Sequence, residues 1–203
     1  NPMNGVVLIS GNGSNLQSII DNVSGIDLNI SCVISSNSDA YGLKRAEKAG
    51  IATAVIDHQL FDSRIAADKE IMKVIDDSRA EVIILAGYMR ILSSEFIDRY
   101  IGKILNIHPS LLPKFKGLNT HQRAIDAGEK IHGASVHFVT EELDGGPVIA
   151  QSIVEIESTD NAKSLASKVL IKEHILYPKI IHWYTQGRIK LINNNSAQLD
   201  GQI

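Results

Sequence analysis

The stretch Lys103–Pro113 reads KILNIHPSLLP and changes character halfway along. Its first part is an apolar run suited to a sheet interior, interrupted by two polar residues, Asn106 and His108. Alternation of side chains along a strand places both on the same face. Pro109 then ends the strand, because a proline has no N–H to donate to a neighbouring strand. The sequence therefore predicts a carboxamide and an imidazole side by side at the end of a buried strand.

This pair of side chains suits a particular chemistry. An amide N–H can hold a developing oxyanion, and an imidazole can move a proton because it titrates near neutral pH. The alternative is an ordinary strand end, in which Asn106 caps a helix and His108 is solvated. The stretch alone leaves both interpretations open.

A second candidate site follows the first predicted strand, Val6–Ile9, whose β-branched run is typical of a strand buried on both faces. The loop SGNGSN comes next, and a helical pattern of apolar residues follows it. Glycines let the backbone approach a ligand, and a helix N-terminus offers unpaired N–H groups to an anion. A phosphate site is one interpretation; the other is a tight turn in which Ser14 or Asn15 caps the helix.

The same loop departs from the dinucleotide-binding pattern G-x-G-x-x-G. That pattern requires a third glycine where Leu16 stands. It also requires an acidic residue near the end of the second strand, Ile30–Ile34, which is followed by Ser-Ser-Asn instead. A single phosphate is therefore favoured over a nicotinamide dinucleotide.

Strand and helix signals alternate through the first half, and the second half contains a hairpin and a terminal helix. This order predicts one doubly wound, Rossmann-like α/β domain over residues 3–192, with a mostly parallel, mixed sheet and a C-terminal helix. A polar tail is expected over residues 193–203. The later strands are predicted at Ile51–Ile56, Val82–Ala86, Ile104–His108, Ile131–Thr140 and Pro147–Ile156.

Helix starts are predicted at residues whose side chains cap well, namely Ser63 (or Asp62), Ser94, Thr120 and Asp160. Pro178 is expected to kink or break the last helix. Ligands of such sheets bind beyond the carboxyl ends of the strands. The glycine loop, Met89–Leu92 and Asn106–His108 all follow strands, so we expect them to meet at one edge.

Bulk composition narrows the function classes. The 44% apolar and 21% charged content is ordinary for a globular protein, and the net charge of −3 implies no general attraction to nucleic acid or anionic membrane. A single cysteine, Cys32, excludes an intramolecular disulfide and favours a reducing compartment, so a cytoplasmic location is expected. No apolar stretch approaches the length of a membrane span.

At these motifs the sequence resembles the glycinamide ribonucleotide transformylases (phosphoribosylglycinamide formyltransferases), the folate-dependent formyltransferases of purine synthesis. The Asn-x-His-Pro-Ser-Leu-Leu-Pro segment marks the wider formyltetrahydrofolate-using fold, and GNGSN narrows it to the purine enzymes. The similarity runs from Met3 to the closing LDGQ. It is carried by VVLISGNGSNLQ, LAGYMRIL, LNIHPSLLP and HGASVHFVTEELDGGPV.

The resemblance implies transfer of a formyl group from N10-formyltetrahydrofolate, as co-substrate, to the amine of 5-phosphoribosylglycinamide, with no metal. It also implies that Asn106, His108 and Asp144 form a catalytic trio. Asn106 and protonated His108 would hold the oxyanion of a tetrahedral intermediate, and Asp144 would stabilise the imidazolium. Without the resemblance, Asp144-Gly145-Gly146 is equally typical of a hairpin turn.

The resemblance assigns further residues to each half of the domain. The phosphate and ribose of the ribonucleotide would be bound by Gly13, Ser14, Asn15, Leu16 and Glu173. The folate would be bound by Arg64, Met89, Arg90, Ile91, Leu92, Asn106, Thr140, Leu143 and Asp144. Ser135 and His137 would support the site from beneath.

One departure from the family concerns the loop at residues 114–119, where Lys116 and Asn119 replace a proline and a second histidine that the family often has. The order and pH response of this loop are therefore left open, as is the choice between monomer and homodimer. Small-molecule substrates are the partners expected.

Three other functions were weighed. A formyltetrahydrofolate hydrolase would use water in place of the amine, but such enzymes usually carry an extra N-terminal domain, whereas this chain is expected to start at its first strand. A methionyl-tRNA formyltransferase would need an added C-terminal domain and a basic face. A non-catalytic nucleotide-binding module would leave the convergence of Asn106, His108 and Asp144 unexplained.

Overall fold

The structure is a computed structural model that describes residues 1–202. It divides into two compact units, Asn1–Leu105 and Asn106–Ile203, and the boundary falls within strand β5. The strands are β1 (Met3–Ile9), β2 (Leu28–Ser35), β3 (Thr53–Val55), β4 (Val82–Leu85), β5 (Ile104–His108), β6 (Ile131–Phe138), β7 (Val148–Glu155), β8 (Ile189–Asn193) and β9 (Ser196–Leu199). The helices are α1 (Ser14–Asn22), α2 (Tyr41–Lys48), α3 (Arg64–Asp77), α4 (Ser94–Arg99), α5 (Thr120–Asp126) and α6 (Ala162–Thr185), with short 3₁₀ helices η1 (Val23–Ile26) and η2 (His58–Leu60).

Sheet topology confirms the predicted mostly parallel, mixed α/β fold with a C-terminal helix. Within residues 1–202 the larger sheet has the strand order β3-β2-β1-β4-β5-β6-β7, and β8 pairs with β9 in a small second sheet. The pairs β1–β2, β1–β4 and β2–β3 are parallel, whereas β6 and β7 are antiparallel. Strand β5, predicted to end before Pro109, does end at His108.

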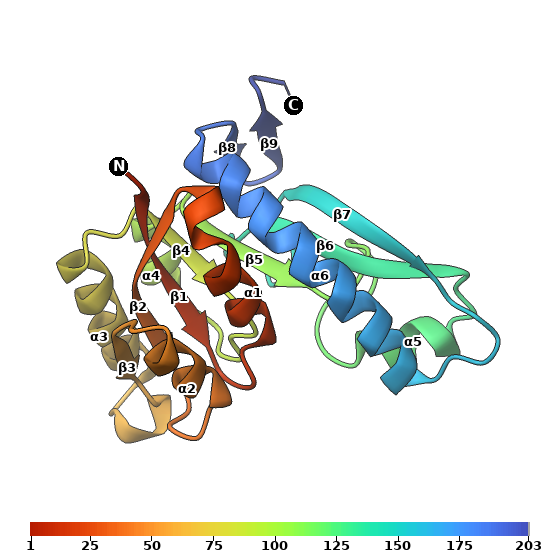
Figure 1. Ribbon diagram of the computed structural model, residues 1–203, viewed down its shortest axis with the longest axis horizontal. Helices are drawn as coiled ribbons and strands as arrows, with labels where there is room; N and C mark the ends of the chain where they lie inside the picture. Colours follow the sequence, from red (N-terminus) through yellow and green to blue (C-terminus); the bar gives the residue numbers. More distant parts are fainter. Residues whose placement is uncertain (203) are drawn as a thin grey trace. The chain divides into compact units, whose positions relative to one another are not determined.

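The first unit is a parallel sheet covered by helices on both faces. Val6–Ile9 of β1 is completely buried, as its continuous β-branched and leucine run predicts. Val7 lies between Val33 of β2 and Ile84 of β4. Helices α1 and α2 cover one face, and α3 and α4 cover the other (Figure 1). The chain thus returns past β1 after β3, which is the doubly wound connection.

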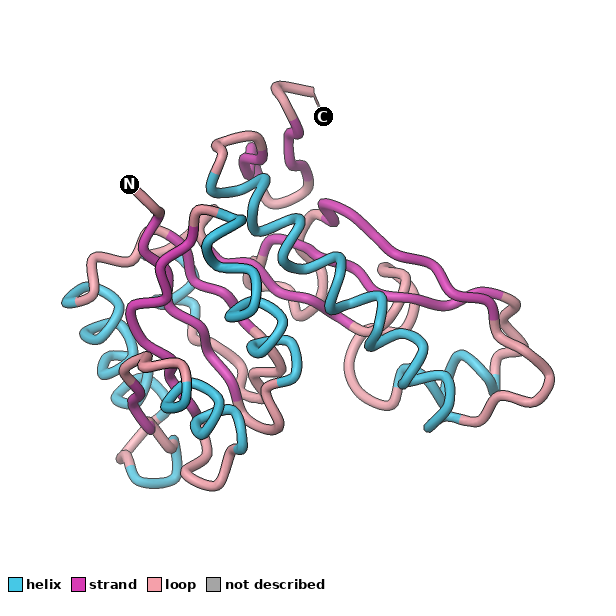
Figure 2. The backbone as a smooth tube through the Cα atoms, in the orientation of Figure 1, coloured by secondary structure: helices cyan, strands magenta, loops and turns pink. Residues whose placement is uncertain are grey.

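The second unit is organised around the β6–β7 hairpin, on which α6 packs (Figure 2). Of the two outcomes expected at Pro178, a kink or a break, the break does not occur, since α6 is continuous from Ala162 to Thr185. Loss of one backbone hydrogen bond at a proline costs about 3 kcal/mol. Burial of apolar side chains on both sides of the proline outweighs that cost. These buried side chains are Leu165, Val169, Leu176, Tyr177, Ile180 and Ile181.

Four of the predicted helix caps are displaced by one residue or more. Ser63 caps α3 as expected, and its hydroxyl accepts the Ala66 N–H. The cap of α4 is Ser93 instead of Ser94, and the cap of α6 is Asn161 instead of Asp160. Adjacent polar residues have similar capping propensities, so the sequence does not separate them.

The other two displaced caps have left-handed backbones. Asn119 (φ 56°) caps α5, while the Thr120 hydroxyl donates to the Pro109 carbonyl oxygen 2.6 Å away. Gly13 (φ 77°) holds the N-cap position of α1, where Ser14 or Asn15 was expected. In both cases tertiary contacts of the loop determine where the helix begins.

The chain ends in a hairpin whose second strand, β9, lies in the polar tail predicted over residues 193–203. β8 and β9 pair in antiparallel fashion, and Arg188 makes two contacts of 2.9 Å with the Asp200 carboxylate. The Arg188 guanidinium also lies over the Trp183 ring of α6. The predicted tail therefore contains a strand, and its last residue, Ile203, lies outside the described residues.

Candidate functional site

His108, the last residue of β5, is held by a carbonyl on one side and faces a carboxylate on the other. Its Nε2 lies 2.8 Å from the Phe115 carbonyl oxygen, and its Nδ1 lies 3.6 Å from Asp144 Oδ2. The side chains of His108 and Asp144 are each 8% exposed. A carbonyl oxygen only accepts hydrogen bonds, so Nε2 carries a proton and donates to Phe115. The remaining nitrogen, Nδ1, is directed at the carboxylate.

Asp144 reaches this position from the turn between β6 and β7. Its backbone is left-handed (φ 51°), a conformation that Asp tolerates better than most residues. The Gly117 N–H donates to Asp144 Oδ2 at 2.8 Å. A side chain at Gly146 would place its Cβ 1.9 Å from the Phe138 carbonyl oxygen, so the chain must have glycine there. The same segment therefore makes the hairpin turn and presents a carboxylate to His108.

Asn106 is oriented by a second histidine. Its Nδ2 lies 3.1 Å from His137 Nε2, and His137 Nδ1 lies 2.9 Å from the Phe138 carbonyl oxygen. Burial lowers the pKa of His137, which favours the neutral ring. With the Nδ1 proton donated to Phe138, Nε2 accepts one N–H of Asn106. This leaves the second N–H of the carboxamide for another acceptor.

Ser135 and Gln151 hold the segment that follows His108. The Ser135 hydroxyl donates to the Ser110 carbonyl oxygen at 2.7 Å and accepts the Leu112 N–H at 3.0 Å. Gln151, opposite Ser135 on β7, donates to the Leu112 carbonyl oxygen at 2.9 Å and to the Ser135 hydroxyl at 3.0 Å. Both backbone polar groups of Leu112 are therefore held by side chains of the hairpin. Sequence analysis did not single out Gln151.

A pair of histidines, the buried His132 and the half-buried His121, lies behind the loop that contacts His108. His132 Nε2 is 3.1 Å from His121 Nδ1, and the His132 ring packs edge-on against the Phe115 ring. His132 is 1% exposed, and burial, together with His121 and His108, lowers its pKa to about 4. Burial also lowers the pKa of His121. Sequence analysis missed both residues, although the alternation of His132 with the apolar Ala134, Val136 and Phe138 along β6 indicates a buried face.

Acidification is expected to destabilise the protein through His132. The folded-state pKa of about 4 lies below the ordinary value of 6.5, so the unfolded chain binds more protons between these pH values. The contribution of neutral His132 to the free energy of unfolding is complete above about pH 6.5. It is lost as the pH falls toward about 4, and the loss is about 3 kcal/mol at most. Urea unfolding between about pH 7.5 and about pH 4 measures this loss. The loss should be smaller in His132→Gln; an equal loss in both proteins would contradict the prediction.

In the first unit, the glycine loop is held against α2. The two glycines Gly13 and Gly42 pack closely against each other. A Cβ added to Gly13 would lie 2.7 Å from the Gly42 Cα. Arg45 of α2 donates from Nε to the Asn12 carbonyl oxygen and from Nη2 to Asn12 Oδ1, both at 2.8 Å. Gly13, Ser14, Asn15 and the buried Leu16 thus lie at the N-terminus of α1, where backbone N–H groups point outward.

Gly13→Ala is expected to lower the free energy of unfolding by about 2 kcal/mol, because the left-handed backbone alone costs about 1–2 kcal/mol with a Cβ. The contact with Gly42 adds to this cost. Gly11→Ala in the same loop is the matched control, since a Cβ there meets nothing within 4 Å in the described chain. Its effect should stay within about 0.5 kcal/mol. Urea unfolding of both variants measures the difference, and equal losses would contradict it.

The residues assigned to the folate by resemblance lie in several segments. Arg64 is exposed in the first turn of α3. Met89 and Ile91 are 64% and 57% exposed, and Leu92 is buried. In the second unit, Thr140 is buried and Leu143 is exposed in the β6–β7 connection, and Glu173 is a buried residue of α6.

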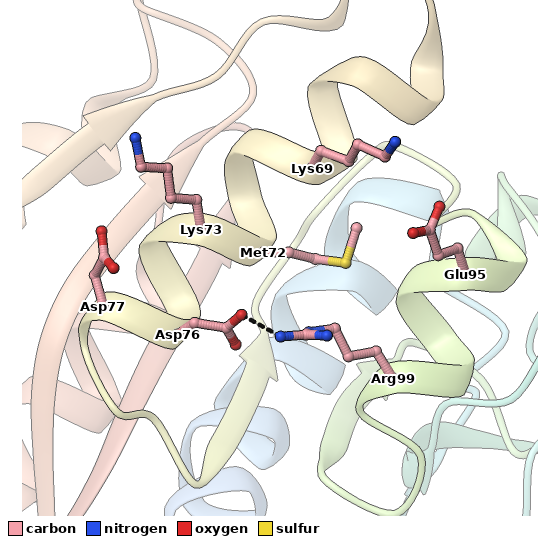
Figure 3. Close-up of a pocket in the computed structure, with 7 residues that line it drawn as sticks. All are labelled: Lys69, Met72, Lys73, Asp76, Asp77, Glu95 and Arg99. Carbon is pink, nitrogen blue, oxygen red and sulfur yellow. Dashed lines mark hydrogen bonds and ion pairs between the residues drawn. The ribbon is translucent and has the colours of Figure 1, made fainter.

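A separate pocket of about 350 Å³ lies between α3 and α4 (Figure 3). Asp76 and Arg99 point toward each other across it and form an ion pair. The residues that line this pocket are Lys69, Met72, Lys73, Asp76, Asp77, Glu95 and Arg99. None of these described residues is among those assigned to the substrates. Separately, no helix within residues 1–202 is both long and apolar enough to cross a membrane.

Comparison with known proteins relates these features to one family. Residues 3–181 match the family model described as formyl transferase. The phosphoribosylglycinamide formyltransferase of Escherichia coli (strain K12) is 51% identical over 202 residues, which cover 98% of this chain and 95% of that protein. That of Haemophilus influenzae is 48% identical over 198 residues, covering 97% and 93% of the two chains.

Solved structures agree with this assignment. The phosphoribosylglycinamide formyltransferase from Coxiella burnetii, in complex with CHES, is similar with a TM-score of 0.96 and 48% identity. The match covers 100% of this chain and 95% of that one. The resemblance detected in the sequence is thereby confirmed. The chain belongs to the formyl transferase family of enzymes.

Proposed function

We propose that this enzyme transfers the formyl group of N10-formyltetrahydrofolate to the amine of 5-phosphoribosylglycinamide, a step of purine biosynthesis. The observation that carries the proposal is the arrangement in the second unit, where His108 faces Asp144 and Asn106 is oriented by His137. Family membership supports it, since the relatives at 51% and 48% identity are phosphoribosylglycinamide formyltransferases.

The amine lone pair attacks the formyl carbon, and the electrons of the C=O bond move onto oxygen. The second N–H of Asn106 and an N–H of His108 donate hydrogen bonds to this oxyanion. Asp144 stabilises the imidazolium form of His108 while negative charge is present on the oxygen. Re-forming the C=O bond then expels folate N10, and a proton passes from the attacking nitrogen to N10 through His108 or water.

The loop after Pro113 must give up its contacts for this to happen. In the structure, Phe115 accepts the Nε2 proton of His108 and Gly117 donates to Asp144. A bound formyl oxygen would replace the Phe115 carbonyl as the acceptor of that N–H. The loop thus keeps the donor and the carboxylate hydrogen-bonded until substrate takes its place, which avoids leaving buried polar groups unpaired.

Both substrates can be placed by the chemistry of the remaining residues. The backbone N–H groups at Gly13–Leu16 would bind the phosphate, since a helix N-terminus favours an anion. The Glu173 carboxylate would accept from the ribose hydroxyls. Arg64 and the segments Met89–Leu92 and Thr140–Asp144 would bind the folate, with the exposed Met89 and Ile91 supplying apolar surface for its rings.

The test is a turnover assay with N10-formyltetrahydrofolate, followed by the change in folate absorbance with and without phosphoribosylglycinamide. We expect turnover that depends on the amine substrate. Equal loss of the formyl group without the amine would identify a hydrolase and overturn the proposal. Absence of turnover with both substrates present would overturn it as well.

A further inference from the structure

Asp68 is a buried carboxylate to which the proposed mechanism gives no role. It lies in α3, and its side chain is 0% exposed. Its Oδ1 is 3.2 Å from His58 Nε2 in η2, and its Oδ2 accepts the Ser93 N–H at 2.7 Å. The two carboxylate oxygens therefore connect α3 to two different loops. We call the three residues His58, Asp68 and Ser93 the buried brace.

The loop that the brace holds is Gly87–Ser93, which carries the segment Met89–Leu92. Near its start the Met89 N–H donates to the Ser10 hydroxyl at 2.8 Å, and at its end the Ser93 N–H donates to Asp68. Leu92 is buried, but the side chains of Met89 and Ile91 are mostly exposed and contribute little packing. The hydrogen bonds at the two ends of the loop are therefore the main contacts that hold this backbone in place.

Two buried polar atoms near the brace have no hydrogen-bond partner within residues 1–202, namely His58 Nδ1 and the Tyr88 hydroxyl. Burial, followed by the charge of Asp68, raises the pKa of Tyr88, so the phenol stays neutral. Unpaired buried polar groups cost free energy, and removing a carboxylate from water carries a penalty that apolar packing does not. Such an arrangement is therefore poorly explained by stability and better explained by placement of the loop.

We propose that Asp68 and His58 are positioning residues for the formyl-donor pocket. The Asp68 carboxylate holds the end of the Gly87–Ser93 loop so that Met89–Leu92 is presented to the folate, and His58 orients the carboxylate. Arg64 lies one turn before Asp68 on α3, so the same helix carries the brace and a residue assigned to the folate. This inference rests on the proposed function, because it assigns the loop to the formyl donor.

The experiment measures kcat and the KM of each substrate for the variants Asp68→Ala, Asp68→Asn, His58→Ala and His58→Gln. Asp68→Ala and His58→Ala should raise the KM of N10-formyltetrahydrofolate about tenfold while the KM of phosphoribosylglycinamide changes less than about twofold. His58→Gln keeps an N–H donor and Asp68→Asn keeps an acceptor oxygen. Both should therefore restore part of the loss, and Asp68→Asn keeps the test possible if Asp68→Ala does not fold.

Two control variants on the same helix separate positioning from stability. Asp77→Asn alters an exposed carboxylate outside the brace and should leave both KM values unchanged. Ile71→Val removes a buried methylene from α3 and reports the effect of lower stability alone. If Asp68→Ala raises the donor KM no more than Ile71→Val does, or raises both KM values equally, the inference is overturned.

Hydrogen exchange provides a readout that does not depend on turnover. The Ser93 and Met89 amides of the unliganded protein should exchange faster in Asp68→Ala than in the parent or in Ile71→Val. Unchanged exchange of these amides would contradict the inference that the Asp68 carboxylate holds the Gly87–Ser93 loop. Failure of the parent protein to transfer the formyl group would overturn the proposed function instead, and the two failures are therefore distinguishable.

Discussion

Asn106→Ala is expected to lower kcat about 10²–10³-fold, the usual cost of removing one oxyanion donor. The carboxamide is oriented before substrate arrives, since one of its N–H groups is committed to His137 at 3.1 Å. In the proposed mechanism the other N–H therefore reaches the developing oxyanion without reorganisation. Because this interaction is made chiefly in the transition state, kcat should fall more than either KM rises. Steady-state kinetics with both substrates measures the effect.

Two further variants make this result specific. Asn106→Asp has nearly the same shape but places a carboxylate where the oxyanion develops, so it should be at least as impaired as Asn106→Ala. Asn29→Ala changes an exposed asparagine that bonds to Asn4 at 3.0 Å and should retain full activity. A kcat within about threefold of the parent for Asn106→Ala would contradict the assignment of this residue.

Removing His108 or Asp144 is expected to show that the two residues act as a unit. His108→Ala should lower kcat about 10²–10⁴-fold, because it removes a proton carrier and an oxyanion donor together. Asp144→Asn keeps the size of the side chain but removes the negative charge that lies 3.6 Å from His108 Nδ1. It should lower kcat by a comparable or smaller factor, since His108 can still donate from Nε2.

The double variant His108→Ala, Asp144→Asn completes a mutant cycle. If Asp144 acts through the imidazolium, the double variant should be little worse than His108→Ala alone. Losses that multiply would show that Asp144 acts independently and would contradict the proposed role. Far-ultraviolet circular dichroism and urea unfolding of all three proteins control for loss of structure, because Asp144 also accepts the Gly117 N–H.

Local signals in the sequence predict the fold well because they depend on near neighbours. The burial of Val6–Ile9, the end of β5 at His108 and the antiparallel pairing of β6 and β7 all follow from apolar runs, proline positions and turn residues. Helix starts are less well predicted. Ser93 and Asn161 replaced the adjacent Ser94 and Asp160, since neighbouring polar residues have similar propensities for capping.

The continuity of α6 shows a tertiary effect prevailing over a local one. A proline such as Pro178 is unfavourable in a helix interior. The apolar residues around it are nevertheless buried together and keep the helix intact. The histidine pair and the buried brace also depend on tertiary structure. Taken alone, His58 and Asp68 are typical of surface residues, and the burial of all three side chains, His132 included, depends on segments distant in the chain.

The sequence by itself determined the order of strands and helices, the polar residues at the end of β5, and the family of the enzyme, because each depends on residues close together in the chain. The tertiary structure alone decided which groups meet. It paired Asn106 with His137, 31 positions away, and Ser93 with Asp68, 25 positions away. It also brought Nε2 of His108 to 2.8 Å from the Phe115 carbonyl oxygen. Such pairings depend on how the hairpin and loops pack, and packing is a property of the whole chain.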